Sequence, residues 1–224
     1  MVFNVGEVLE ATVNSLKAGK VYLIQKQTYS DEIKGHLKRL NPDDRHLRFG
    51  TSITDDRIDH YVDDAVKIDD FLFGVFGNDG SIVAFLHMAR DARDKNAFEL
   101  GLSVDSEFRG EGYASAMFEK AVTFAKTLGA KRIFTYCLAE NKAMQSLAKK
   151  HDLRVMLEYG DVTGELELPQ RSSVEIVNNL VDFATTEQMM IFDKMSYNMV
   201  HTMLNQFNAF EIASKSFAKL LRTF

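Results

Sequence analysis

The chain has 224 residues, of which 46% are hydrophobic and 26% are charged, as in globular proteins that bury a sizeable core. Its formal net charge of −5 argues against nucleic acid as a partner, since proteins that bind nucleic acid gather positive charge on one surface. The single cysteine excludes a disulfide framework, and the lack of a secretion signal or of any run of ~20 apolar residues predicts a cytoplasmic protein without a membrane span.

Strand and helix signals alternate along the first 168 residues. In the first half, the periodicity of apolar residues predicts strands over 20–27, 71–76 and 81–88, and helices over 30–40 and 55–70. The second half is predicted to contain strands over 97–104, 132–138, 155–159 and 162–168, with helices over 112–128 and 141–150. Gly77-Asn78-Asp79-Gly80 between two early strands indicates a β-hairpin. This order predicts an α/β fold in which helices cover a layered sheet.

The residues that break regular structure indicate a boundary near Pro169. Both prolines and all 13 glycines lie at or before that residue. We therefore predict one α/β domain over residues 1–169 and a helical C-terminal extension over residues 170–224.

The pattern that carries chemistry lies between residues 97 and 115. Alternation along the strand places Glu99, Gly101 and Ser103 on one face. A face that is small and polar apart from one carboxylate is typical of a cleft. The strand is followed by Arg109-Gly110-Glu111-Gly112-Tyr113-Ala114-Ser115, whose glycines let backbone amides approach a ligand at the start of a helix. Free N–H groups and the positive end of the helix dipole favour a pyrophosphate there.

Three segments, in the same order, resemble the GNAT superfamily of acetyltransferases. The loop Arg109–Ala114 is similar to their acetyl-coenzyme A loop, [Gln/Arg]-x-x-Gly-x-[Gly/Ala]. Upstream, Arg39-Leu40-Asn41-Pro42-Asp43-Asp44-Arg45-His46-Leu47-Arg48-Phe49 resembles a segment of bacterial protein-lysine acetyltransferases of the Pat type. Downstream, Glu140-Asn141 with Met144, Leu147 and Ala148 resembles their Glu-Asn-x-x-Met-x-x-Leu-Ala helix start. The resemblance covers about residues 20–168 and implies a GNAT fold: a central mixed, mostly antiparallel sheet, splayed beside residues 104–107, with helices on both faces.

The resemblance also implies a co-substrate and a set of site residues. The pyrophosphate of acetyl-coenzyme A would be held by the amides of Arg109, Gly110, Gly112, Tyr113, Ala114 and Ser115. Its pantetheine arm would pair with the strand at Leu102, Ser103 and Val104, where a backbone N–H polarises the thioester carbonyl, and Asn141 would contact the same arm. Glu99 matches the glutamate that Pat-type enzymes use as general base, which takes a proton from the amine before attack. No metal is implied.

The expected function is transfer of an acetyl group to a primary amine, on a protein lysine or a small molecule, by direct attack. The alternative is a non-catalytic module that binds acyl-coenzyme A and signals through its C-terminal helices. Tight binding of the cofactor without turnover would identify that alternative. The expected partners are thus an amine-bearing substrate and, through residues 170–224, another copy or another protein.

The resemblance to GNAT enzymes does not identify the general acid, which would give a proton to the leaving coenzyme A. Many GNAT enzymes have a tyrosine general acid in the helix after Asn141, but the corresponding residue here is Ala148, as in many Pat-type sequences. Tyr136 and solvent remain as candidates. Of the six histidines, only His87 is placed to approach the cleft, and a structural or rim position is favoured over a catalytic one. Cys137 lies in an apolar strand and is expected in the core.

Two segments have other possible roles. Residues 55–70 contain seven aspartates. A capped helix with a solvated acidic face is favoured there over a site that binds a cation or steers a cationic amine. An apolar stripe follows residues 192–224 at steps of three and four, with a gap around Ala213 and Ser214. It runs through Phe192, Met195, Met199, Met203, Phe207, Phe210, Phe217, Leu220 or Leu221, and Phe224. Pairing with another copy or another protein is favoured slightly over packing on its own domain, and binding to a lipid surface is the third possibility.

Overall fold

The computed structural model describes residues 20–67, 69–77, 79–158 and 161–169. The predicted C-terminal stripe lies outside these residues, so the division of the chain near Pro169 stays a prediction. Among the described helices, none has both the length and the apolar character needed to cross a membrane.

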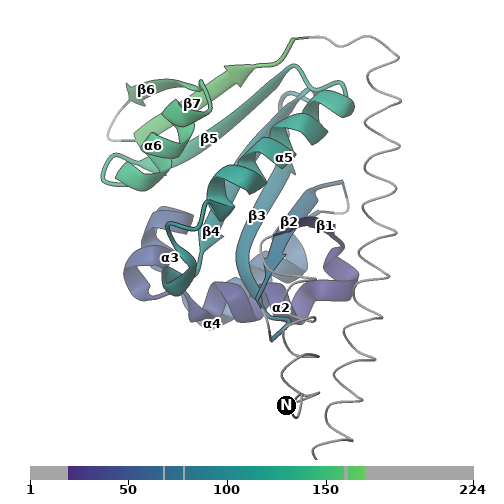
Figure 1. Ribbon diagram of the computed structural model, residues 1–224, viewed down its shortest axis with the longest axis vertical. Coiled ribbons are helices and arrows are strands. Elements are labelled where there is room, and N and C mark those ends of the chain that lie inside the picture. The colour runs from purple at the N-terminus through teal and green to yellow at the C-terminus, as the bar shows by residue number, and fades with distance from the viewer. Residues whose placement is uncertain (1–19, 68, 78, 159–160, 170–224) are drawn as a thin grey trace, which may run out of the picture.

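A seven-stranded sheet forms the centre of the fold (Figure 1). Its order is β1-β2-β3-β4-β5-β7-β6, and every neighbouring pair is antiparallel except β4 and β5, which run parallel. The prediction of a mixed, mostly antiparallel sheet is therefore confirmed. The strands are β1 (Val21–Ile24), β2 (Phe71–Phe76), β3 (Ile82–Arg90), β4 (Ala97–Val104), β5 (Arg132–Leu138), β6 (Arg154–Glu158) and β7 (Asp161–Glu167).

Helices cover both faces of this sheet, as predicted (Figure 1). One face carries α5 (Tyr113–Thr127) and α6 (Lys142–Lys150), and the other carries α2 (Lys26–Arg39), α3 (Pro42–Phe49), α4 (Asp55–His60) and the π-helical turn η1 (Tyr61–Ala65). Alternation along β3 divides the core between them, because Phe85 packs into the apolar cluster of α2 and α4 whereas Leu86 packs into that of α5.

The sheet opens between β4 and β5. Their parallel pairing runs only from Ala97–Arg132 to Glu99–Phe134, although β4 continues to Val104 and β5 to Leu138. The splay expected beside residues 104–107 is present and begins earlier along β4, since the strands are already apart after Glu99. Beyond that point the β5-facing edge of β4 has no strand partner among the described residues, while β3 pairs with its other edge.

The start of α2 differs from the prediction. The strand predicted over 20–27 ends at Ile24, because Lys26 already begins the helix. The ammonium of Lys26 donates to the carbonyl oxygens of Asp63 and Val66, at 2.9 and 2.7 Å, and these long-range bonds fix the first turn. The predicted start near Ser30 coincides with a kink at Tyr29 (φ −124°, ψ 19°), after which the helix continues.

The helix α3 is absent from the elements predicted above, although its signals stand in the sequence. The Asn41 side chain accepts the N–H of Asp44 at 2.8 Å, and Pro42 occupies the first turn. Gly50 ends the helix in the left-handed region at φ 72°. The helix predicted over 55–70 ends earlier, at Ala65, and the Asp70 carboxylate then accepts the N–H of Lys67 at 2.8 Å in the turn that leads to β2.

Candidate active site

A cavity of about 470 Å³ lies where β4 leaves β5. Strand β4, the loop before α5 and the first turns of α5 and α6 form its walls, together with α3. Every residue predicted to contact the cofactor lines it: Leu102, Ser103, Val104, Arg109, Gly110, Gly112, Tyr113, Ala114, Ser115 and Asn141. The structure therefore brings this predicted set together, whereas Glu99 is not among the lining residues.

The loop before α5 presents backbone amides to this cavity. A short 3-10 turn, η2 (Ser106–Phe108), leads into it, and Gly110 and Gly112 adopt left-handed backbone with φ 85° and 84°. The first helical N–H to be paired is that of Ala116, which donates to the Gly112 carbonyl. The preceding N–H groups at the start of α5 have no intrahelical partner, so they and the helix dipole suit the pyrophosphate of coenzyme A.

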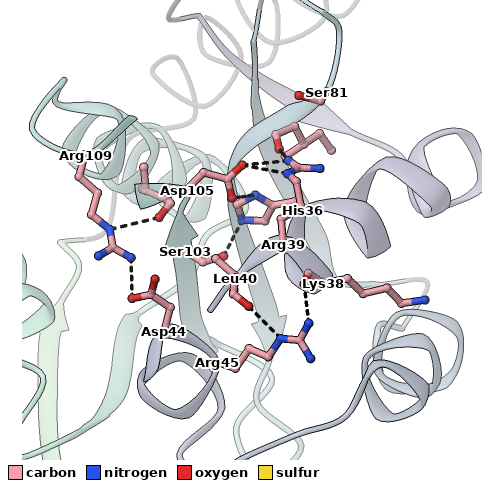
Figure 2. Close-up of polar contacts among 12 residues, drawn as sticks. His36, Lys38, Arg39, Leu40, Asp44, Arg45, Ser81, Ser103, Asp105 and Arg109 are labelled. Atoms are coloured by element: carbon pink, nitrogen blue, oxygen red, sulfur yellow. Dashed lines mark hydrogen bonds and ion pairs between the residues drawn. The ribbon is translucent and has the colours of Figure 1, made fainter. Parts of the chain in front are cut away.

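The side chain of Arg109 is bound within the protein. Its Nη2 lies 2.6 Å from Asp44 Oδ1 on α3, and its Nε donates to the Val104 carbonyl at 3.4 Å (Figure 2). Arg109 therefore ties the loop to α3 and β4 through its side chain, and its backbone N–H donates to the Ser106 carbonyl at 3.4 Å.

Replacing Gly112 by alanine is expected to raise the KM for acetyl-coenzyme A about tenfold. Nothing lies within 4 Å of an added Cβ, so the loop of the free variant can relax out of the left-handed backbone (φ 84°), and cofactor binding must restore it at a cost of about 1–2 kcal/mol for a residue with a Cβ. Gly129, at the end of α5, is the matched control, because it has the same strain (φ 73°) and the same open space. Steady-state kinetics should show the KM rise in G112A and not in G129A; an equal change in both would contradict the role of the loop.

Asn141 joins two walls of the cavity. Its Oδ1 caps α6 by accepting the N–H of Met144 at 3.0 Å, and its Nδ2 donates to the Leu47 carbonyl of α3 at 3.4 Å. The side chain thus holds α3 against the start of α6. Contact of Asn141 with the pantetheine arm remains a prediction.

Ser115 is paired through its hydroxyl. The Oγ lies 2.8 Å from His151 Nε2, and the imidazole stacks on Phe118 with ring centroids 4.8 Å apart. Burial lowers the pKa of His151, so its neutral form predominates at neutral pH. The hydroxyl is therefore engaged, which leaves the Ser115 amide for a ligand.

Glu99 lies on β4 before the residues of that strand that line the cavity. It is the last residue of β4 that pairs with β5, and its side chain is exposed. Its charge also reaches Tyr61, whose pKa is raised by burial first and further by the carboxylates of Asp70 and Glu99, against the lowering effect of Arg48. The predicted base thus stands beside a polar cluster that sequence reasoning missed.

That cluster is a chain of four side chains from four different segments. His87 Nε2 lies 2.9 Å from Asp70 Oδ2, and His87 Nδ1 lies 2.6 Å from the Tyr61 hydroxyl, to which Arg48 Nη2 donates at 3.0 Å. Hydrogen bonds from His87 and two backbone N–H groups lower the pKa of Asp70 although burial opposes them. An ionised Asp70 requires a proton on Nε2, so Nδ1 accepts the Tyr61 hydroxyl. His87 is buried at 7% exposure, in agreement with the structural position favoured above.

A second buried chain joins α2 to the end of β4. His36 is fully buried, with Nε2 at 2.8 Å from the Ser103 hydroxyl and Nδ1 at 2.9 Å from Asp105 Oδ1 (Figure 2). The second contact is an ion-pair distance without good hydrogen-bond alignment. Arg39 also reaches Asp105, at 2.9 Å. This chain fixes Ser103, so the predicted small and polar face of β4 is partly a packed, buried one.

The aspartates of residues 55–70 are mostly paired. The described ion pairs are Asp55 with Arg45, Asp59 with Lys38, Asp63 with Lys34, Asp64 with His60, Asp69 with Arg90 and Asp70 with His87. Within the described ranges, no group of three or more acidic, histidine or cysteine side chains is arranged to hold a metal ion. This pairing supports the helix-face interpretation over cation binding.

The remaining candidates lie away from the cavity or have no acid–base group. Cys137 is buried, which raises its pKa, and it packs in the core as predicted. Tyr136 is 59% exposed on β5 and does not line the cavity. Ala148 is buried in α6. The proton donor that many GNAT enzymes place there is therefore missing from this helix position.

Known proteins resemble this chain in sequence and in fold. A family model described as "Acetyltransferase (GNAT) family" matches residues 38–152. The GNAT domain of S. lividans PAT is similar in fold, at 19% identity and a TM-score of 0.56, over 66% of this chain and 89% of that chain. An N-acetyltransferase from Staphylococcus aureus Mu50 is similar at 18% identity and a TM-score of 0.54, over 67% of this chain and 98% of that chain.

A third solved structure, spermidine N-acetyltransferase from Vibrio cholerae in complex with CoA and spermine, is similar at 14% identity and a TM-score of 0.53, over 66% of this chain and 94% of that chain. A search of curated proteins finds no significant match. The family model covers just over half of the chain, and the cavity is built from its glycine loop and splayed strands. The protein therefore belongs to the GNAT family and is an N-acetyltransferase that uses acetyl-coenzyme A.

Proposed function

We propose that the protein acetylates the primary amine of a protein lysine or a small molecule, with Glu99 as general base. One observation carries the proposal: Glu99 is exposed and lies where β4 parts from β5, on the strand whose following residues Leu102, Ser103 and Val104 line the cavity. An amine is protonated at neutral pH, so a carboxylate at this point can take a proton, directly or through water, before the nitrogen attacks. Direct attack requires no covalent intermediate with the enzyme.

The cavity residues would hold the co-substrate in register with Glu99. Acetyl-coenzyme A supplies an acetyl group that is activated as a thioester. Amides of residues 109–115 would bind its pyrophosphate, and the free edge of β4 at Leu102–Val104 would pair with its pantetheine arm. A backbone N–H of this edge would polarise the carbonyl.

Protein lysine is the first acceptor that we propose. The segment 39–49 resembles Pat-type lysine acetyltransferases, and it forms the end of α2 and all of α3, which line the cavity. The fold similarity to a PAT domain is consistent with this choice, and the similar spermidine acetyltransferase represents the small-amine alternative.

The proposal is tested by following thiol release from acetyl-coenzyme A with the purified full chain. The acceptors are a lysine-containing peptide, the same peptide with arginine in place of lysine, and a polyamine. Release that depends on lysine or polyamine, with a matching mass increase of the acceptor, is the expected result. Thiol release that is independent of any amine would refute the proposed reaction, and preference for the polyamine would correct the acceptor.

A further inference from the structure

Arg48 places a positive charge against the strand that forms the inner wall of the cavity. It lies on α3, one residue after Leu47, whose carbonyl is bound by Asn141. A Cβ built on Gly101 would lie 2.8 Å from its Cζ, Nη1 and Nη2. The guanidinium therefore stacks on the backbone of β4 at the one position where that strand has no side chain, and Arg48 lines the cavity.

The charge of Arg48 is not neutralised within the described residues. Among the described residues its single hydrogen-bond partner is the Tyr61 hydroxyl, to which Nη2 donates, and its buried Nε has no partner there. None of the salt bridges between described residues includes it. A partly buried guanidinium with unused donors and no carboxylate is suited to a negative charge that a ligand brings or develops.

The Tyr61–His87–Asp70 chain holds the guanidinium in place. The ionised Asp70 fixes the His87 tautomer, so the Tyr61 hydroxyl donates to His87 and its oxygen is left to accept from Arg48. The Phe49 and Tyr61 rings lie beside the guanidinium, with centroids 5.0 and 5.7 Å from Cζ. These contacts position Arg48 without cancelling its charge.

The direction of the cofactor determines which atom would meet this charge. If the pyrophosphate lies at residues 109–115 and the arm pairs with Leu102–Val104, then the sulfur end reaches the level of Gly101. The backbone N–H groups of β4 at that level would donate to the carbonyl oxygen of the thioester. Ala148 offers no proton to the sulfur. The leaving sulfur would thus lack the donor that many GNAT enzymes place in this helix, and it would lie next to the Arg48 guanidinium.

We propose that Arg48 stabilises the thiolate of coenzyme A as it leaves, in place of a proton donor. This inference rests on the proposed acetyl transfer. The ammonium first loses one proton through Glu99 to water. The free amine nitrogen then bonds to the acetyl carbon, the carbon–sulfur bond breaks with its electron pair on sulfur, and the second proton on nitrogen passes to Glu99 and on to water. The products are the amide, the coenzyme A thiolate and two protons, so no protein acid is needed at this step.

The test measures protons released when coenzyme A binds to the full chain, by calorimetry in Hepes and in Tris. At a pH about half a unit below the pKa of the free coenzyme A thiol, a neighbouring arginine that lowers this pKa by about one pH unit releases about half a proton per bound molecule. Coenzyme A without its sulfhydryl group is the control ligand, because it keeps every other contact. R48Q should abolish the difference between the two ligands, and R48K should keep most of it.

The possible results distinguish failure of the proposed role of Arg48 from failure of the proposed acetyl transfer. Wild-type binding of coenzyme A with equal proton release for both ligands overturns the role of Arg48, whether or not R48Q folds. The role of Arg48 is also overturned if R48Q binds the control ligand normally and shows the same difference in proton release between coenzyme A and the control ligand as the wild type. In either case, acetyl transfer by the wild type shows that the proposed function stands. Failure of the wild type to bind coenzyme A overturns both.

Discussion

Replacing Glu99 by glutamine is expected to lower kcat by about 100-fold to 10,000-fold, the range over which a positioned general base accelerates a reaction. Glutamine keeps the size of the side chain but cannot accept the amine proton. The KM for acetyl-coenzyme A should change little, because Glu99 does not line the cofactor cavity. Steady-state kinetics with a saturating amine separates the two parameters.

The pH dependence of this variant gives a second measurement. A lysine amine has an ordinary pKa of about 10.4, so free amine becomes abundant as pH rises towards that value. The deficit of E99Q relative to the wild type should therefore shrink with rising pH, because solvent then does the work of the base. A pH-independent deficit would point to a role in positioning instead.

Glu167 provides the matched control. It is an exposed carboxylate on β7 of the same sheet, without an ion pair among the described residues. E167Q should retain wild-type kinetics, and both variants should unfold within about 0.5 kcal/mol of the wild type, since exposed substitutions rarely cost more. Wild-type kcat in E99Q would remove Glu99 from the mechanism.

The cofactor cavity could be predicted from sequence because its residues are local to one strand–loop–helix unit. The alternation in β4, the glycines before Tyr113 and the helix start at Asn141 are short-range patterns, and the structure places all of them around one cavity. The bounds of β4 and β5 agree with prediction for the same reason.

The polar chains behind the cavity could not be predicted in this way. Arg48, Tyr61, His87 and Asp70 come from four segments, and His36 lies 67 residues from Ser103. No periodicity links such residues; only the packing of α2, α3 and η1 on the sheet brings them together. The cap signals at Asn41 and Gly50 would have revealed α3, but not what Arg48 faces.

Replacing Asp105 by asparagine is expected to lower the free energy of unfolding by about 3 kcal/mol at neutral pH, because the buried His36 imidazole and Arg39 lose a charged acceptor. The Asp105 side chain is 14% exposed, and it serves both the fully buried His36 and Arg39. Its loss leaves the imidazole and Ser103 without their anchor. Urea unfolding followed by circular dichroism measures the difference.

The pH at which this stabilisation disappears follows from the carboxyl group. Burial raises the pKa of Asp105, but the close contact with His36 and the hydrogen bonds and charge of Arg39 outweigh it, so the folded pKa lies below the ordinary value. The unfolded chain binds a proton at about pH 3.9, before the folded protein does, so the contribution is present above that pH and is lost as pH falls through the folded pKa. The gap between the wild type and D105N should therefore be constant from about pH 7 to about pH 5 and close below about pH 4.

Asp31, exposed on α2 and without an ion pair among the described residues, is the control for a general charge effect. D31N should change the free energy of unfolding by less than about 0.5 kcal/mol at every pH. If D105N is as stable as D31N at neutral pH, the Asp105–His36–Ser103 chain does not stabilise the fold. D105N could also be destabilised and still bind acetyl-coenzyme A with wild-type affinity. The Asp105–His36–Ser103 contacts would then stabilise the fold alone, because Ser103 would keep its place in the cavity wall without Asp105.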